Sequence, residues 1–150
     1  MAETSFDENI QRSIDKFWEV IPPLWRGVRK HIHDQAMEDF QITLAQFHIL
    51  RHIRSGLDSV SELAKTGKIS RPAISRGVDS LVIKGLVNRS TDSKDRRHIQ
   101  LSLTTEGETL LDELFGNNRQ WMASKMISLS EADLKTIQQG LDALQKALIE

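Results

Sequence analysis

The stretch SRPAISRGVDSLVIKGLVNRSTDSKDRRHIQLSLT, residues 70–104, decides the fold of this chain. It begins with Ser70, a favoured helix N-cap residue, and carries Pro72 in the first turn, where the missing N–H costs least. Apolar residues then recur at helical spacing, and two segments of alternating polarity, 86–91 and 98–103, enclose a polar tip. The pattern predicts an amphipathic helix joined to a two-stranded hairpin, the combination that makes a winged helix-turn-helix.

The segment before this stretch supplies the remaining helices of such a core. Thr43-Leu44-Ala45-Gln46 has the form of a capping box, and the apolar residues behind it predict a buried helix that ends near Gly56. A short helix is expected at about 61–67. Residues 43–104 are therefore predicted to form one winged helix-turn-helix region.

Both ends of the chain are predicted to be helices with a single apolar stripe. The N-terminal stripe follows four-three spacing, and Pro22-Pro23 within it predicts a kink or a short break. The last helix starts at Ser130-Glu131-Ala132-Asp133, and its apolar residues again follow three-four spacing. The two stripes comprise Ile10, Ile14, Phe17, Ile21, Leu24, Val28 and Ile32, and Leu134, Ile137, Leu141, Leu144 and Leu148.

These stripes would be too exposed if the chain were alone. Packed on each other and on a second subunit they form a helical dimer interface, with an intrachain bundle as the alternative. We therefore expect a mainly α fold with a small β-wing. In it, N- and C-terminal helical dimerisation arms, residues 1–42 and 105–150, flank the winged helix-turn-helix of residues 43–104 in one intertwined domain.

The charge of the chain is unevenly distributed. The net charge is −1, yet residues 61–104 carry nine Lys or Arg against four Asp or Glu, a balance of +5. The other residues carry 11 basic and 17 acidic side chains, a balance of −6. A basic module in an acidic frame favours a polyanionic partner such as double-stranded DNA.

Composition excludes several classes of protein. The chain has no cysteine, which excludes disulfides, thiolate metal sites and thiol redox switches. No apolar run approaches the roughly 20 residues of a membrane span, and no secretory signal is visible, so a cytoplasmic protein without a membrane partner is expected. No Gly-rich phosphate loop, nucleophile elbow or catalytic metal spacing is present, so we expect neither an enzyme nor a cofactor.

Two short motifs give the chain a family resemblance. Asp95-Arg96-Arg97 is followed by Leu103-Thr104-Thr105-Glu106-Gly107. Together with the order of the predicted elements, these motifs resemble the multiple-antibiotic-resistance regulator (MarR) family over nearly the whole chain. The resemblance implies a homodimeric winged-helix transcription regulator, commonly a repressor released by a small ligand. A twofold dimer would read an inverted-repeat operator.

The predicted DNA contacts lie at the start of the recognition helix and at the hairpin tip. Side chains in the first two helical turns can reach base edges, and Arg76 can contact guanine bidentately. An arginine suits a narrow minor groove, and the resemblance makes Arg97 the wing arginine with Asp95 as the residue that holds it. A solvated polar surface is the alternative. The predicted contact residues are Ser70, Arg71, Ser75, Arg76, Lys94, Asp95, Arg96 and Arg97, with Lys65, Lys68 and Arg89 as phosphate neutralisers or solubilising groups.

A ligand pocket is implied by the resemblance, between the helical region and the winged core. An aromatic wall with one cation would suit an aromatic carboxylate or a phenol. Aromatic residues at helical spacing are otherwise core residues, which is the alternative. The candidate lining residues are Trp18, Trp25, Phe40, Phe47 and His48, with Arg26, Arg29 or Arg51 to pair with an anionic group.

Two other functions stay open beside a ligand-released DNA-binding regulator. One is a winged-helix module that binds a protein instead of DNA, although the basic hairpin argues against it. The other is a metal-responsive regulator, because His48 and His52 stand four residues apart and can share a metal. The chain has no Cys, and no acidic residue lies on the same helical face as these two histidines. No metal site is therefore predicted.

Overall fold

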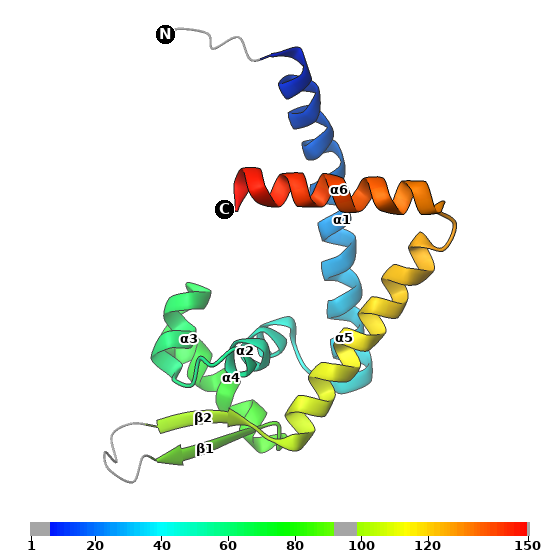
Figure 1. Ribbon diagram of the computed structural model, residues 1–150. Helices are drawn as coiled ribbons and strands as arrows, with labels where there is room; N and C mark the ends of the chain where they lie inside the picture. Colours follow the sequence, from blue (N-terminus) through cyan, green and yellow to red (C-terminus); the bar gives the residue numbers. More distant parts are fainter. Residues whose placement is uncertain (1–6, 92–98, 150) are drawn as a thin grey trace, which may run out of the picture. The chain divides into compact units, whose positions relative to one another are not determined.

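The computed structural model describes residues 7–91 and 99–149, and the secondary structure there is mainly helical with one small antiparallel sheet (Figure 1). The chain divides into two compact units, residues up to Phe115 and residues from Gly116 onward. The predicted fold class, mainly α with a β-wing, is confirmed. In chain order the elements are α1 (Glu8–Phe40), α2 (Leu44–Arg54), α3 (Val60–Gly67), α4 (Arg71–Ile83), β1 (Val87–Thr91), β2 (Ile99–Leu103), α5 (Thr105–Met126) and α6 (Glu131–Leu148).

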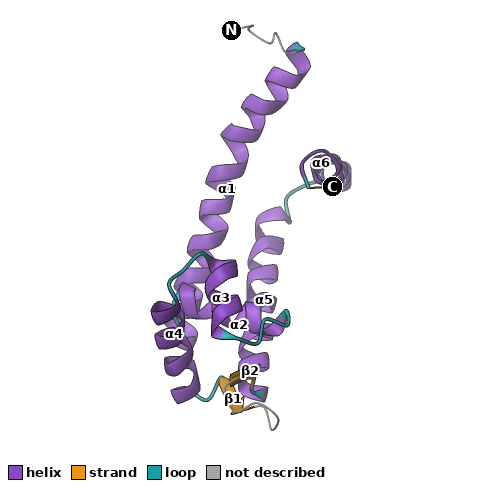
Figure 2. Cartoon of the chain, turned by 90° about the vertical axis from the view of Figure 1, so that its left-hand side faces the viewer, coloured by secondary structure: helices purple, strands orange, loops and turns teal. Residues whose placement is uncertain are grey.

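Helix α1 is one uninterrupted helix, as Figure 2 shows. Of the predicted kink or short break at Pro22-Pro23, the break is therefore wrong. Two prolines remove the hydrogen bonds that would reach the carbonyl groups of Trp18 and Glu19. Both of these residues are exposed, so water can satisfy the freed carbonyl groups. Helical turns on both sides then carry the helix through to Phe40.

Helices α2, α3 and α4 form the predicted helix-turn-helix. The capping box of α2 is confirmed, because the Gln46 N–H donates to Thr43 Oγ1 at 3.2 Å and the Thr43 N–H donates to Gln46 Oε1 at 2.9 Å. Gly56 follows the helix with a φ of +98°, which only glycine adopts readily. Ser70 occupies the N-cap position of α4, but its side chain makes no capping hydrogen bond, contrary to prediction.

One hydrophobic core joins these helices to the sheet. Helix α4 contacts α2, α3 and β1, and the apolar face of each helix lies in this cluster. Arg54 of α2 also reaches α5, where its guanidinium lies 2.8 Å from Asp112 Oδ1 and above the Phe115 ring. The fully buried large side chains are Ile42, Leu50, Leu63, Val78, Leu81, Val87 and Leu111.

The hairpin pairs Val87 with Leu103 and Thr91 with Ile99, so each predicted strand is confirmed to within one residue. The loop between α2 and α3 anchors its second strand. Asp58 accepts hydrogen bonds from the Leu101 N–H at 2.7 Å, through its carbonyl oxygen, and from Gln100 Nε2 at 2.8 Å, through Oδ2. The sheet is therefore fixed to the helix-turn-helix and is not a free arm.

The junction between the hairpin and α5 explains the Leu-Thr-x-x-Gly motif. Thr104 donates from Oγ1 to the Gly85 carbonyl at 2.6 Å and from its N–H to the Leu86 carbonyl at 3.2 Å. The same Oγ1 accepts from the Gly107 N–H at 3.0 Å. A Cβ at Gly107 would lie 2.2 Å from the Leu86 carbonyl oxygen, so only glycine fits there.

The second unit contains the end of α5 and all of α6. Helix α6 begins with a capping box, because the Asp133 N–H donates to Ser130 Oγ and the Ser130 N–H donates to Asp133 Oδ2. These hydrogen bonds lower the pKa of Asp133. Among its described residues α6 has no buried side chain, and Ile137, Leu141 and Leu148 of its apolar stripe are exposed. Across the described parts of the chain, every helix is too short or too polar to cross a membrane.

Replacing Gly107 with alanine tests the junction. We expect Gly107→Ala to lower the free energy of unfolding by about 2–3 kcal/mol, because the new methyl group meets a backbone carbonyl that cannot move aside without repacking. Gly116→Ala, in the same helix but with open space at its Cβ, is the control and should stabilise by roughly 0.5–1 kcal/mol. Urea unfolding of both variants is the measurement, and equal effects would contradict the close-approach argument.

Candidate nucleic-acid interface

Helix α4 has one face in the core and one face in solvent. Ile74, Val78 and Leu81 are buried, whereas Arg71 and Arg76 are exposed. The sequence places the same division on the helix, because apolar residues recur every three or four positions. The two guanidinium groups are therefore held on the outside by the burial of the opposite face.

The residues of the recognition helix that are predicted to contact DNA all lie at the start of α4, within residues 70–76. Ser70, Arg71 and Arg76 are exposed, and Ser75 is half-buried. The Ser70 side chain makes no capping hydrogen bond to the first N–H groups of α4. These N–H groups can therefore interact with an anion. The predicted wing residues Lys94, Asp95, Arg96 and Arg97 lie outside the described residues. All eight contact assignments stay predictions.

An ion pair connects the recognition helix to the hairpin. Arg89 of β1 lies 2.6 Å from Asp79 of α4, and the two side chains are 32% and 49% exposed. Arg89, predicted as a phosphate neutraliser or a solubilising group, therefore has a carboxylate partner inside the protein. Sequence reasoning did not single out Asp79, because nothing in the sequence indicates a pairing between a helix and a strand ten residues away.

Three further contacts fix α4 against its neighbours. Gln46 Nε2 donates to Ser80 Oγ at 2.9 Å, and Lys84 Nζ donates to the Gln41 carbonyl at 2.6 Å. Gly77 allows α2 to approach closely, because a Cβ there would lie 2.6 Å from Ile49 Cδ1. The helix that carries Arg71 and Arg76 is thus held along its length, which preorganises its exposed face.

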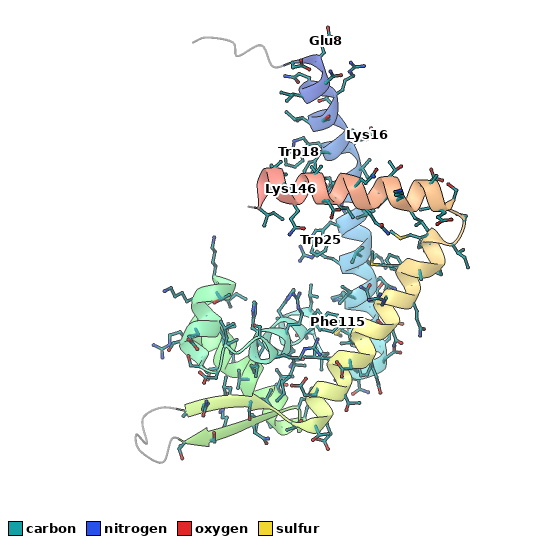
Figure 3. The ribbon with its side chains drawn as sticks, viewed as in Figure 1. Glu8, Lys16, Trp18, Trp25, Phe115 and Lys146 are labelled. Carbon is teal, nitrogen blue, oxygen red and sulfur yellow. The ribbon has the colours of Figure 1, made fainter. Side chains whose placement is uncertain are left out.

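The predicted ligand residues fall into two groups. Phe47 is buried with its ring 5.9 Å from the Phe115 ring, its neighbour His48 is exposed, and the Arg51 guanidinium lies 5.9 Å from the Phe47 ring centre. Trp18 and Trp25 project from the same side of α1 and are 66% and 56% exposed (Figure 3). Only the α2 residues are brought together.

Trp25 borders a shallow cavity of about 460 Å³ between α1 and the start of α2. Its other lining residues are Pro22, Arg26, Arg29, Lys30, His33 and Leu44. Lys30 is paired with Asp34 at 2.5 Å, and this pairing raises the pKa of Lys30 and lowers that of Asp34. Of the predicted cations, Arg26 and Arg29 lie at this cavity and Arg51 does not.

The two histidines considered for a metal lie on α2. Burial lowers the pKa of His48, and neighbouring cationic groups, Arg51 first, lower it further. The imidazole is therefore neutral near pH 7. Within residues 7–91 and 99–149 no three His, Asp or Glu side chains are grouped so that they could hold a metal ion.

Comparison with known proteins finds that this chain is similar to transcription regulators. A sequence model of the MarR family matches residues 40–98. The transcriptional repressor MdtR of Bacillus subtilis is 33% identical over 101 residues, which are 67% of this chain and 65% of MdtR. The uncharacterised regulator YhbI of the same organism is 33% identical over 86 residues, 57% of this chain and 56% of YhbI. The matched region thus spans less than two thirds of either relative.

Solved structures agree with the described fold. YusO of Bacillus subtilis has a TM-score of 0.75 at 26% identity, over 91% of this chain and 97% of YusO. A mutant of MepR from S. aureus, bound to an oligodeoxyribonucleotide, has a TM-score of 0.67 at 23% identity, over 88% of this chain and 97% of MepR. The second likeness supports the fold alone.

A double-mutant cycle tests whether the Asp79–Arg89 pair holds the hairpin to α4. We expect Asp79→Asn and Arg89→Gln to show a coupling energy of about 0.5–1 kcal/mol in urea unfolding, because the pair joins separate elements and its side chains are only 49% and 32% exposed. The matched control pair, Lys16 and Glu19 on α1, is 69% and 68% exposed and should couple by less than ~0.3 kcal/mol. A coupling no larger than that of the control would show that the pair does not tether the hairpin.

Proposed function

We propose that this chain, which is similar to transcriptional regulators of the MarR family, is a sequence-specific DNA-binding repressor, active as a homodimer and released by a small ligand. One observation carries the proposal: α4 exposes Arg71 and Arg76 on a helix whose other face is buried in the core and whose C-terminal part is held by hydrogen bonds. The MepR protein, similar in fold, binds an oligodeoxyribonucleotide. A rigid cationic helix of this kind fits a DNA major groove.

The two arginines of α4 have different proposed roles. Arg71, in the first turn, lies beside N–H groups that favour a phosphate, so it contributes affinity without reading sequence. Arg76, one turn further, donates to guanine O6 and N7 and reads sequence. The wing arginine, proposed as Arg97 with Asp95 holding it, enters the adjacent minor groove.

The dimer is proposed from the unsatisfied apolar surface of the terminal helices. Ile137, Leu141 and Leu148 of α6 are exposed, and α1 exposes Ile10, Ile14 and Leu24. Surfaces of this kind at regular helical spacing are buried in an isologous interface when two copies meet. A twofold dimer presents two recognition helices about one turn of DNA apart, ~10 base pairs centre to centre, and requires an inverted-repeat operator.

The ligand is proposed to occupy the cavity at Trp25. An indole ring stands beside Arg26 and Arg29, for which the structure gives no carboxylate partner among the described residues. An aromatic carboxylate or a phenolate matches a flat apolar wall with cations at its edge. Trp18, Phe47, His48 and Arg51 stay predicted ligand residues beside this cavity.

Salt-dependent DNA binding separates the roles of the two arginines. The fluorescence anisotropy of a duplex from the DNA upstream of the protein's own gene is titrated at several salt concentrations. Arg71→Ala should reduce the slope of log affinity against log salt by about 1, because one phosphate contact is lost. Arg76→Ala should lower the preference over a scrambled duplex by roughly 1–3 kcal/mol.

Lys16→Ala removes an exposed cation of α1 and is the control for charge alone. It should leave both the slope and the preference unchanged. Loss of binding that is equal for all three variants would show general electrostatic attraction instead of a docked helix. Failure of the unmutated protein to retard any duplex at low salt would favour the protein-binding alternative.

The dimer is tested by a charge on the exposed stripe of α6. Leu141→Glu should give a monomer in light scattering at micromolar concentration, because a buried carboxylate without a partner opposes association. Gln139→Glu adds the same charge on the opposite side of α6 and should remain a dimer. A dimeric Leu141→Glu protein would exclude this stripe from the interface.

A further inference from the structure

Helix α1 ends in a left-handed turn that is unusual for the residue it contains. Gln41, which follows Phe40, has a φ of +53°, a region that glycine and asparagine adopt more readily than glutamine. The N–H groups of Gln41 and Ile42 both donate to the Ala36 carbonyl. Ala36 and Ile42 are fully buried, so the turn is held in place from inside the core.

The charges at the end of α1 are unfavourable within the helix itself. The C-terminal end of a helix carries a partial negative charge, which cationic side chains stabilise. The last turn of α1, all of which is described, contains no basic residue, and Glu38 and Asp39 add two carboxylates there. Lys84, at the end of α4, supplies the missing cation, because its Nζ donates to the Gln41 carbonyl at 2.6 Å.

A second hydrogen bond joins the same part of the chain to α4. Gln46, which forms the capping box of α2 with Thr43, donates from Nε2 to Ser80 Oγ at 2.9 Å. Ser80 and Lys84 are four residues apart and therefore lie on the same side of α4. The C-terminal part of α4 is thus bonded to the connection between α1 and α2, whereas the exposed arginines of α4 lie N-terminal to both bonds.

We propose that Lys84 is a positioning residue for DNA recognition, because it makes the orientation of α4 depend on the end of α1. The inference rests on the proposed function, in which α4 reads the operator. Lys84 acts on the arginines of α4 through the helix and does not contact the DNA. Since α1 also lines the Trp25 cavity, Lys84 connects the helix at that cavity to the helix that reads the bases.

The variant Lys84→Met tests the proposal, because methionine keeps an apolar stem and removes the donor. Binding to the upstream duplex and to a scrambled duplex is measured by fluorescence anisotropy at several salt concentrations. The preference for the upstream duplex should fall roughly tenfold, because a shifted helix loses bidentate base contacts but keeps its attraction to phosphates. The salt slope on the scrambled duplex should not change. A slope reduced by about 1 would show that Lys84 contacts a phosphate directly and would overturn the proposal.

Two further variants separate the hydrogen bond from the loss of a charge. Lys84→Arg keeps a cationic donor and should restore most of the preference that Lys84→Met loses. Lys16→Met removes an exposed lysine whose partner, Glu19, lies on the same helix, and it should leave the preference unchanged. An equal loss in Lys84→Arg and Lys84→Met, or in Lys16→Met and Lys84→Met, would overturn the role of the bond.

Amide hydrogen exchange, followed by NMR without DNA, tests the connection independently of the proposed function. In Lys84→Met the Ile42 N–H, which belongs to the turn after α1, should exchange faster by roughly tenfold. The Leu50 N–H, within the buried helix α2, should exchange as it does in the unmutated protein. Unchanged exchange at Ile42, or equal acceleration at Leu50, would overturn a local role for Lys84. Failure of the unmutated protein to bind either duplex would instead refute the proposed function, and the exchange result would still decide whether Lys84 joins α4 to α1.

Discussion

The close approach of α5 to the base of the hairpin is the constraint on which the interface depends. Gly107 lies against the Leu86 carbonyl, and Thr104 bonds to the two residues that end the turn after α4. A carbonyl cannot rotate out of the way as a side chain can, so the glycine sets the distance between α5 and β1. The hairpin, the end of α4 and the start of α5 are thereby fixed to one point.

Further contacts along α4 hold the helix that carries the interface. Ser80 bonds to Gln46 of α2, and Lys84 bonds to the Gln41 carbonyl at the end of α1. Asp79 pairs with Arg89 of β1, and Gly77 packs on Ile49. Each of these contacts is modest, but together they leave α4 few alternative positions. A helix that is already ordered loses little entropy when it meets a partner, so its exposed arginines can contribute more of their interaction energy to binding.

Local patterns in the sequence predicted the local structure well, but they did not predict the contacts between residues far apart in the chain. The capping box at Thr43, the start of the last helix at Ser130, the helix before the hairpin and both strands follow from residues a few positions apart. The break at Pro22-Pro23 failed because an exposed helix can give its lost hydrogen bonds to water. The Asp79–Arg89 pair and the close approach of Gly77 to Ile49 depend on how separate elements meet, which spacing along one chain does not encode.

The position of the Trp25 cavity limits how a ligand there could control DNA binding. A ligand can shift an equilibrium only by its difference in affinity between the two states. At Trp25 the ligand would touch α1 and the first residue of α2, so its effect on α4 would have to pass through packed helices that have two arrangements. Because α4 is held at Gly77, Ser80 and Lys84, a ligand at Trp25 would have to move α4 together with the elements that hold it.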